Sequence, residues 1–237
     1  RVEDDAVFDD THRLILELVH AGIVDGLRID HIDGLADPLG YLNRLREATG
    51  PDCYITVEKI LAKGEQLPAD WPVSGTTGYE FIASLAEVLV DDNSLERLEK
   101  IHDETLGTTV DRHAELRDAK GLMTDRNFEG EFTTLLTIAT ELAQHNGAEI
   151  PVEEIRHALR ELLIAFPVYR TYGTAEGLTP SDVVLLNRVV ASVNTSEPAL
   201  SLIVHILTGD LPERDRDAAT LFRTRFQQLT GPLMAKS

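Results

Sequence analysis

The sequence has little cysteine and little positive charge, and both shortages narrow the classes of protein that it can encode. Its one cysteine, Cys53, lies in an apolar run, which excludes a framework of disulfides within the chain. Lysine and arginine number 22 against 41 aspartates and glutamates, so the formal charge is −19. Nucleic acids and anionic membranes attract basic surfaces, and we therefore expect neither as a partner.

The sequence also lacks the patterns that indicate a membrane span, a cofactor site or a metal site. No apolar run approaches the ~20 residues that cross a bilayer, and no signal peptide is visible, so we expect a cytoplasmic protein. The stretch Gly75-Thr76-Thr77-Gly78 is no phosphate loop, because the Lys-Ser/Thr pair that ends one is missing. Asp30, His31 and Asp33 have poor spacing for zinc and no cysteine or histidine cluster beside them. We predict no metal and no cofactor.

The N-terminal part does contain a strand–helix–strand pattern, preceded by an amphipathic helix over residues 5–21. Residues 24–30 and 53–58 are short apolar runs, and residues 37–50 between them have the cap, proline and leucine spacing of a helix. Parallel strands joined by a helix have their carboxyl ends on one edge of the sheet. Asp30 and Glu58, which end the two strands, should therefore project into one cleft.

Arg28 and Asp30 share one face of the first strand, because side chains alternate along a strand. The guanidinium can keep this carboxylate ionised and oriented through a charge-assisted hydrogen bond, as a glycosidase nucleophile requires. A structural ion pair at a strand end also explains the two residues, and from them alone it is the simpler interpretation.

Two motifs at these strand ends are similar to a known superfamily. Residues 26–31 (GLRIDH) and 57–61 (VEKIL), followed by Gly75-Thr76-Thr77-Gly78-Tyr79, resemble the α-amylase superfamily of retaining glycosidases and transglycosylases. The superfamily usually has Lys-His three and four residues after the nucleophile, and Asp33-Gly34 at that place resembles its trehalose-forming branch. The resemblance is strongest over residues 1–90.

This resemblance implies a nucleophile at Asp30 and a general acid/base at Glu58, which would keep its proton if the cleft is apolar. The implied reaction moves the reducing-end α-1,4 linkage of a maltooligosaccharide to an α,α-1,1 linkage within one bound molecule. The alternatives are a glucan hydrolase or transferase of the same superfamily, and a segment that binds glucan without turnover.

Substrate contacts are expected from residues at or near these motifs, namely Arg28, His31, Lys59, Trp71 and Tyr79. The role of Lys59 follows from the resemblance alone, because strand alternation turns its side chain away from that of Glu58. Trp71 and Tyr79 could stack on sugar rings, although a hydrophobic anchor explains a lone tryptophan equally well. His31 without the resemblance would be an ordinary polar residue.

The expected fold class is α/β plus α. Residues 1–90 would supply central strands of a (β/α)8 TIM barrel. Helical periodicity dominates residues 91–237, which would form a large all-helical insertion. A loop over residues 62–78 would close the substrate pocket. The remaining barrel strands and a third carboxylate that the superfamily uses would lie outside the chain, which opens with Arg1. We therefore expect an interior segment whose partners are a maltooligosaccharide and the rest of the same polypeptide.

Overall fold

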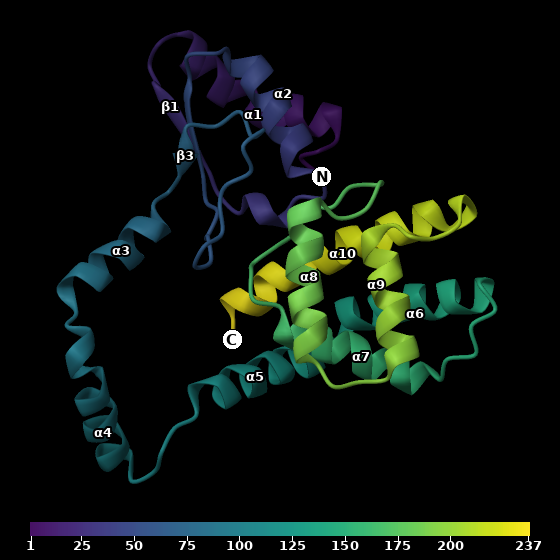
Figure 1. Ribbon diagram of the computed structural model, residues 1–237. Coiled ribbons are helices and arrows are strands. Elements are labelled where there is room, and N and C mark those ends of the chain that lie inside the picture. Colours follow the sequence, from purple (N-terminus) through teal and green to yellow (C-terminus); the bar gives the residue numbers. More distant parts are fainter. The chain divides into compact units, whose positions relative to one another are not determined.

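The structure is a computed structural model that describes all 237 residues and divides into two compact units, Arg1–Thr108 and Thr109–Ser237 (Figure 1). The division comes later than the boundary expected after residue 90. Helix α4 (Leu95–Leu106) lies between these two boundaries, and α3 (Tyr79–Leu89) ends just before the first of them; neither helix buries any of its residues. No helix combines the length and the apolar character needed to cross a membrane.

The N-terminal unit is built on a three-stranded parallel sheet of β1 (Gly26–Ile29), β2 (Tyr54–Val57) and β3 (Gly75–Thr76), in that order. Ile55 and Val57 of β2 are fully buried, as expected for a central strand. The sequence predicts β1 and β2, whereas β3 lies in the stretch predicted as a loop. A loop rather than a helix joins β2 to β3, so the strand–helix alternation of a barrel is present only between β1 and β2.

Helices α1 (Asp5–His20) and α2 (Pro38–Thr49) pack on each other in this unit. The carboxylates of Asp4 and Asp37 cap their N-termini, and α2 ends before Gly50, whose φ of 86° favours glycine. Both predicted helices are thus confirmed, and so is the predicted cap at Asp37, because these signals are local in the sequence.

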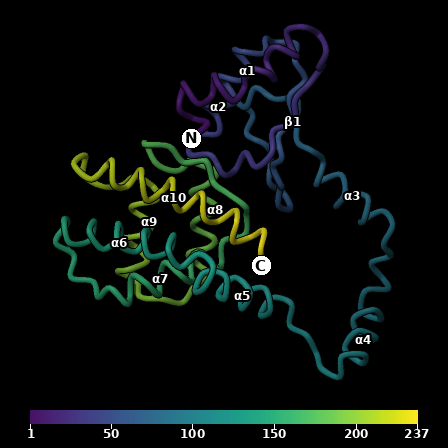
Figure 2. The backbone as a smooth tube through the Cα atoms, turned by 180° about the vertical axis from the view of Figure 1, so that it is seen from behind, coloured from purple at the N-terminus to yellow at the C-terminus, as the bar shows by residue number.

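The C-terminal unit is entirely helical. Helices α6, α7, α9 and α10 pack together around its core, as both views show (Figures 1 and 2). In chain order, the helices are α5 (Arg112–Leu122), α6 (Glu129–His145), α7 (Val152–Ala165), α8 (Pro180–Ser192), α9 (Glu197–Thr208) and α10 (Arg216–Ala235). Sequence periodicity predicts helices over residues 129–146 and 152–166, from residues 180 and 197 onward, and over residues 214–229, but not α5; the last helix in fact continues through Pro232.

One buried arginine stabilises the end of α9. Arg223, which is 1% exposed, donates from Nε to the Leu207 carbonyl (2.7 Å) and from Nη2 to the Ile206 carbonyl (2.9 Å). Its Nη1 donates to the carbonyl of Thr174, in the loop before α8. The last carbonyls of a helix have no partner within it, so this guanidinium satisfies them and joins the loop to the helix end.

Candidate active site

The carboxyl ends of β1 and β2 bring the two predicted catalytic acids to one edge of the sheet. Ile29 pairs with Val57 in the parallel register, and Asp30 and Glu58 follow them directly. The backbone amide of Glu58 donates to the Ile29 carbonyl over 2.7 Å, which extends the pairing to the acids themselves. The two side chains therefore leave equivalent positions of adjacent strands, as the sequence predicts.

A single guanidinium lies between the two carboxylates. Arg28 places Nη1 2.6 Å from Oδ1 of Asp30 and Nη2 3.5 Å from Oε1 of Glu58. The hydrogen bond to Asp30 is the main cause that raises the pKa of Arg28, and the charge of Glu58 adds to it. Arg28 thus supplies one positive charge in contact with both acids.

The surroundings of Glu58 are polar. Its Oε2 accepts a hydrogen bond from the backbone amide of His31 over 3.0 Å, and its side chain is 23% exposed. The sequence predicts an apolar cleft around this acid. The contacts of Glu58 with a backbone amide and a guanidinium show that its surroundings are polar instead. Asp30 is the more open of the two, with a side chain that is 68% exposed.

His31 has a left-handed backbone conformation, with a φ of 52°, and no other residue except glycine in the chain has a positive φ. Its exposed imidazole lies against Gly34, where an added Cβ would approach Nε2 to 2.4 Å. Left-handed residues of this kind carry backbone strain and often mark functional sites. The same strained turn directs the His31 amide toward Glu58.

The other expected substrate contacts differ in exposure. Tyr79, at the start of α3, is 40% exposed. Trp71 is 6% exposed and Lys59 is fully buried. Arg28, His31 and Tyr79 are therefore open to a ligand in this structure, whereas Trp71 offers it little surface and Lys59 none.

Sequence reasoning missed the residue that fixes the loop over residues 62–78. Arg46 of α2 donates to the Cys53 carbonyl (2.6 Å), just before β2, and to the Pro72 carbonyl (2.9 Å) in the loop. These acceptors are backbone atoms of distant residues, and no side-chain pattern in the sequence could have identified them.

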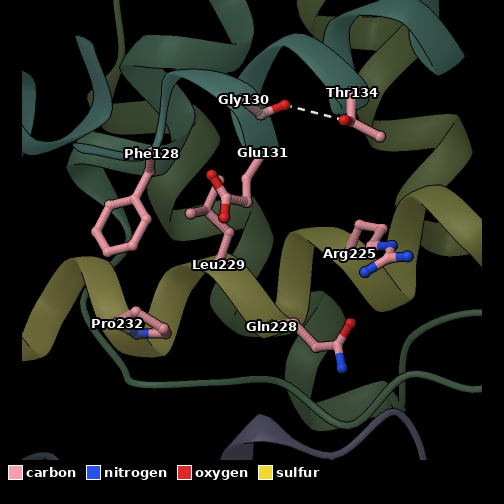
Figure 3. Close-up of a pocket in the computed structure, with 8 residues that line it drawn as sticks. All are labelled: Phe128, Gly130, Glu131, Thr134, Arg225, Gln228, Leu229 and Pro232. Carbon is pink, nitrogen blue, oxygen red and sulfur yellow. Dashed lines mark hydrogen bonds between the residues drawn. The ribbon is translucent and has the colours of Figure 1, made fainter. Parts of the chain in front are cut away.

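A separate cavity lies between α6 and α10 of the C-terminal unit (Figure 3). Its lining mixes polar and apolar groups and consists of Phe128, Gly130, Glu131, Thr134, Arg225, Gln228, Leu229 and Pro232. None of the residues predicted from the sequence lines it. The chain also has no group of three or more His, Cys, Asp or Glu side chains arranged to hold a metal ion, so Asp30, His31 and Asp33 do not form one.

Comparison with known proteins gives a consistent result over the whole chain, although no family model matches it. A Mycobacterium tuberculosis protein, named provisionally as a maltooligosyl trehalose synthase, is 31% identical over 237 residues, which are 100% of this chain and 29% of that protein. The maltooligosyltrehalose synthase of Arthrobacter ramosus superposes with a TM-score of 0.80 at 33% identity, over 99% of this chain and 28% of that one. The chain matches a segment of maltooligosyltrehalose synthase.

A third comparison agrees at greater evolutionary distance. A Sulfolobus tokodaii structure, titled a hypothetical maltooligosyl trehalose synthase, has a TM-score of 0.71 at 26% identity, over 99% of this chain and 27% of its own. The expected resemblance to the trehalose-forming branch is thus confirmed. The chain spans less than a third of the length of each of these maltooligosyltrehalose synthases.

Proposed function

We propose that the chain is an interior segment of a maltooligosyltrehalose synthase and supplies its nucleophile and its general acid/base. The observation that carries the proposal is the pair Asp30 and Glu58, which end adjacent parallel strands with one guanidinium between them. Retaining enzymes need two carboxylates close enough to act on the same anomeric carbon from its two sides. Similarity to maltooligosyltrehalose synthases over the whole chain supports this assignment.

The proposed reaction has two steps. Asp30 attacks the anomeric carbon of the penultimate glucose, while Glu58 gives its proton to the departing oxygen of the reducing-end glucose. The released glucose turns within the pocket. Its anomeric hydroxyl then loses its proton to Glu58 and attacks the covalent intermediate, which frees Asp30 and forms the α,α-1,1 linkage. Water must be excluded throughout, because it would compete with the returning glucose.

Arg28, His31 and Tyr79 are the side chains that we propose contact the sugar, since each is exposed and lies in or shortly after a strand of the sheet that carries the two acids. The fold around them would be a segment of a (β/α)8 barrel over residues 1–90 and a helical insertion over residues 91–237. The remaining strands, and the third carboxylate that the superfamily uses, would come from the rest of the polypeptide. A cytoplasmic location stays a prediction.

Replacing Glu58 by Gln in the complete polypeptide tests this function. With maltopentaose as substrate, the unchanged protein should form a non-reducing product, and Glu58→Gln should lower its rate by roughly 10²–10⁴-fold, the usual contribution of a general acid. Glu87→Gln, on the exposed surface of α3, is the matched control and should retain full activity.

Three outcomes would count against the proposal. Full activity of Glu58→Gln would remove this residue from the mechanism. Reducing sugars in place of a non-reducing product would indicate a hydrolase of the same superfamily. Binding of maltopentaose without turnover in the unchanged polypeptide would indicate a glucan-binding protein.

A further inference from the structure

Lys59, the residue directly after Glu58, is the most completely enclosed charge of the N-terminal unit. Its side chain has no exposed surface. Its Nζ lies 2.8 Å from Oε1 of Glu65 and 3.4 Å from Oδ2 of Asp33. A buried ammonium is costly unless carboxylates neutralise it, so these two partners account for its position.

The two partners come from different segments of the site. Asp33 belongs to the short 3-10 turn η1 (Ile32–Gly34), which begins two residues after Asp30. Glu65 belongs to the loop that follows β2, and its Oε2 accepts from the Ala62 amide over 2.8 Å. One ammonium therefore joins the segment after the first acid, the segment after the second acid, and the loop beside them.

The side chain of Lys59 is turned away from the cleft. Neighbouring side chains of an extended segment point to opposite faces, so the side chain of Glu58 leads to Arg28 while that of Lys59 leads into the interior. A sugar at Glu58 cannot reach an ammonium that has no exposed surface and two carboxylates around it. A direct substrate contact is therefore not the role that this geometry supports.

We propose that Lys59 is a positioning residue: with Asp33 and Glu65, it fixes the backbone after Asp30 and after Glu58 so that the two acids keep their spacing. This proposal rests on the proposed function for its catalytic consequence, but the connection between the two segments stands on the ion pairs alone. Small displacements of catalytic groups slow a reaction strongly: about 1 Å of misplacement can lower the rate roughly 10²-fold.

Steady-state kinetics of Lys59→Met in the complete polypeptide test the catalytic part. A positioning residue should lower kcat by about 10²-fold and leave KM within about threefold, because ground-state binding of the sugar does not use it. Lys100→Met is the matched control: it removes the same charge from a side chain of α4 that is 77% exposed and lies outside the loop over residues 62–78, and it should leave both constants unchanged. A raised KM with an unchanged kcat would overturn the proposal in favour of a sugar contact.

Glu65→Gln is a second variant with a smaller risk of misfolding, because Lys59 keeps Asp33 as a partner. It should lower kcat in the same direction but less. If the three residues act as one unit, Lys59→Met alone and Lys59→Met combined with Glu65→Gln should lower kcat by similar factors. Additive effects of the two substitutions on the activation free energy would contradict the proposal.

Amide hydrogen exchange separates a failure of this proposal from a failure of the proposed function. In Lys59→Met, exchange should accelerate both at residues 32–35 and at residues 59–65, with no change in α2. This result is expected whether or not the unchanged polypeptide forms a non-reducing sugar. Acceleration in the 59–65 segment alone would show that Lys59 does not join the two strand ends.

Discussion

The backbone amide of His31 donates to Oε2 of Glu58 over 3.0 Å, so the residue after one proposed catalytic acid holds the other. This contact crosses from the end of β1 to the end of β2 and depends on the left-handed turn at His31. Together with the ion pairs of Arg28, it links the two carboxylates across the ends of the adjacent strands.

The first prediction concerns the bridging guanidinium. Arg28→Lys keeps the charge, but an ammonium cannot span two carboxylates as a planar guanidinium does. We expect kcat for the non-reducing product to fall by roughly 10–10²-fold in the complete polypeptide, because the acids lose their common spacer. Arg97→Lys on the exposed surface of α4 should have no effect. Equal activity of both variants would show that the bridge is only structural.

The second prediction concerns backbone strain at the site. Asparagine adopts the left-handed region more readily than histidine, so His31→Asn should raise the free energy of unfolding, by up to about 1 kcal/mol. His31→Val should lower it by at least as much, because β-branched residues resist this conformation. Urea denaturation of the two variants should move in opposite directions. A shift in the same direction would mean that the turn is not strained.

The third prediction is a pH dependence of stability from His12. This buried imidazole stacks on Phe8, and its Nε2 lies 2.9 Å from the hydroxyl of Tyr41. Desolvation lowers the pKa of His12 below 6.5, a backbone hydrogen bond to Phe8 opposes this shift, and the charge of Arg44 adds to it. Just below about pH 6.5, His12 is therefore protonated in the unfolded chain but still mostly neutral in the folded chain.

The stabilising contribution of neutral His12 should be complete above about pH 6.5 and should be lost as the pH falls toward the lowered pKa of the folded state. Thermal unfolding measured between about pH 5 and 8 should show this slope, and His12→Gln should reduce it. His20→Gln, on the exposed side of the same helix, is the control and should retain the slope. An unchanged slope in His12→Gln would assign the effect to other groups.

The fourth prediction concerns the end of α9. Arg223→Met should destabilise the C-terminal unit by about 3 kcal/mol, because it leaves the carbonyls of Ile206 and Leu207 buried without their donor. Arg225→Met, two residues further along α10 and exposed, should change stability by less than about 0.5 kcal/mol. Calorimetry of both variants would check the difference, and similar melting temperatures would contradict it.

The sequence predicts those parts of this molecule whose signals are local. The cap at Asp37, the helix stop at Gly50 and the acids at two strand ends are all predicted from short patterns. Strand β3 is too short to have a pattern of its own, and its pairing with β2 is non-local. Such pairings depend on tertiary contacts rather than on residue type.

Two helices of the C-terminal unit were also not fully predicted from local sequence patterns. Helix α5 lacks a clear apolar stripe, since most of its residues are exposed, so periodicity does not predict it. Helix α10 continues past a proline that ordinarily ends a helix, because residues around it, such as Gly231 and Leu233, are buried against the core. At the candidate site, the partners of Lys59 and Arg46 were equally invisible, since burial and backbone acceptors leave no local signal.

Helices α3 and α4 have a practical consequence for work with this chain by itself. Both helices bury no residue, yet they expose a series of large apolar side chains, including Phe81, Ile82, Val88, Leu89 and Leu98. Apolar surface of this extent promotes self-association in water. Purified alone, the chain should therefore aggregate at high concentration, and a mild detergent or a fused carrier protein should keep it dispersed.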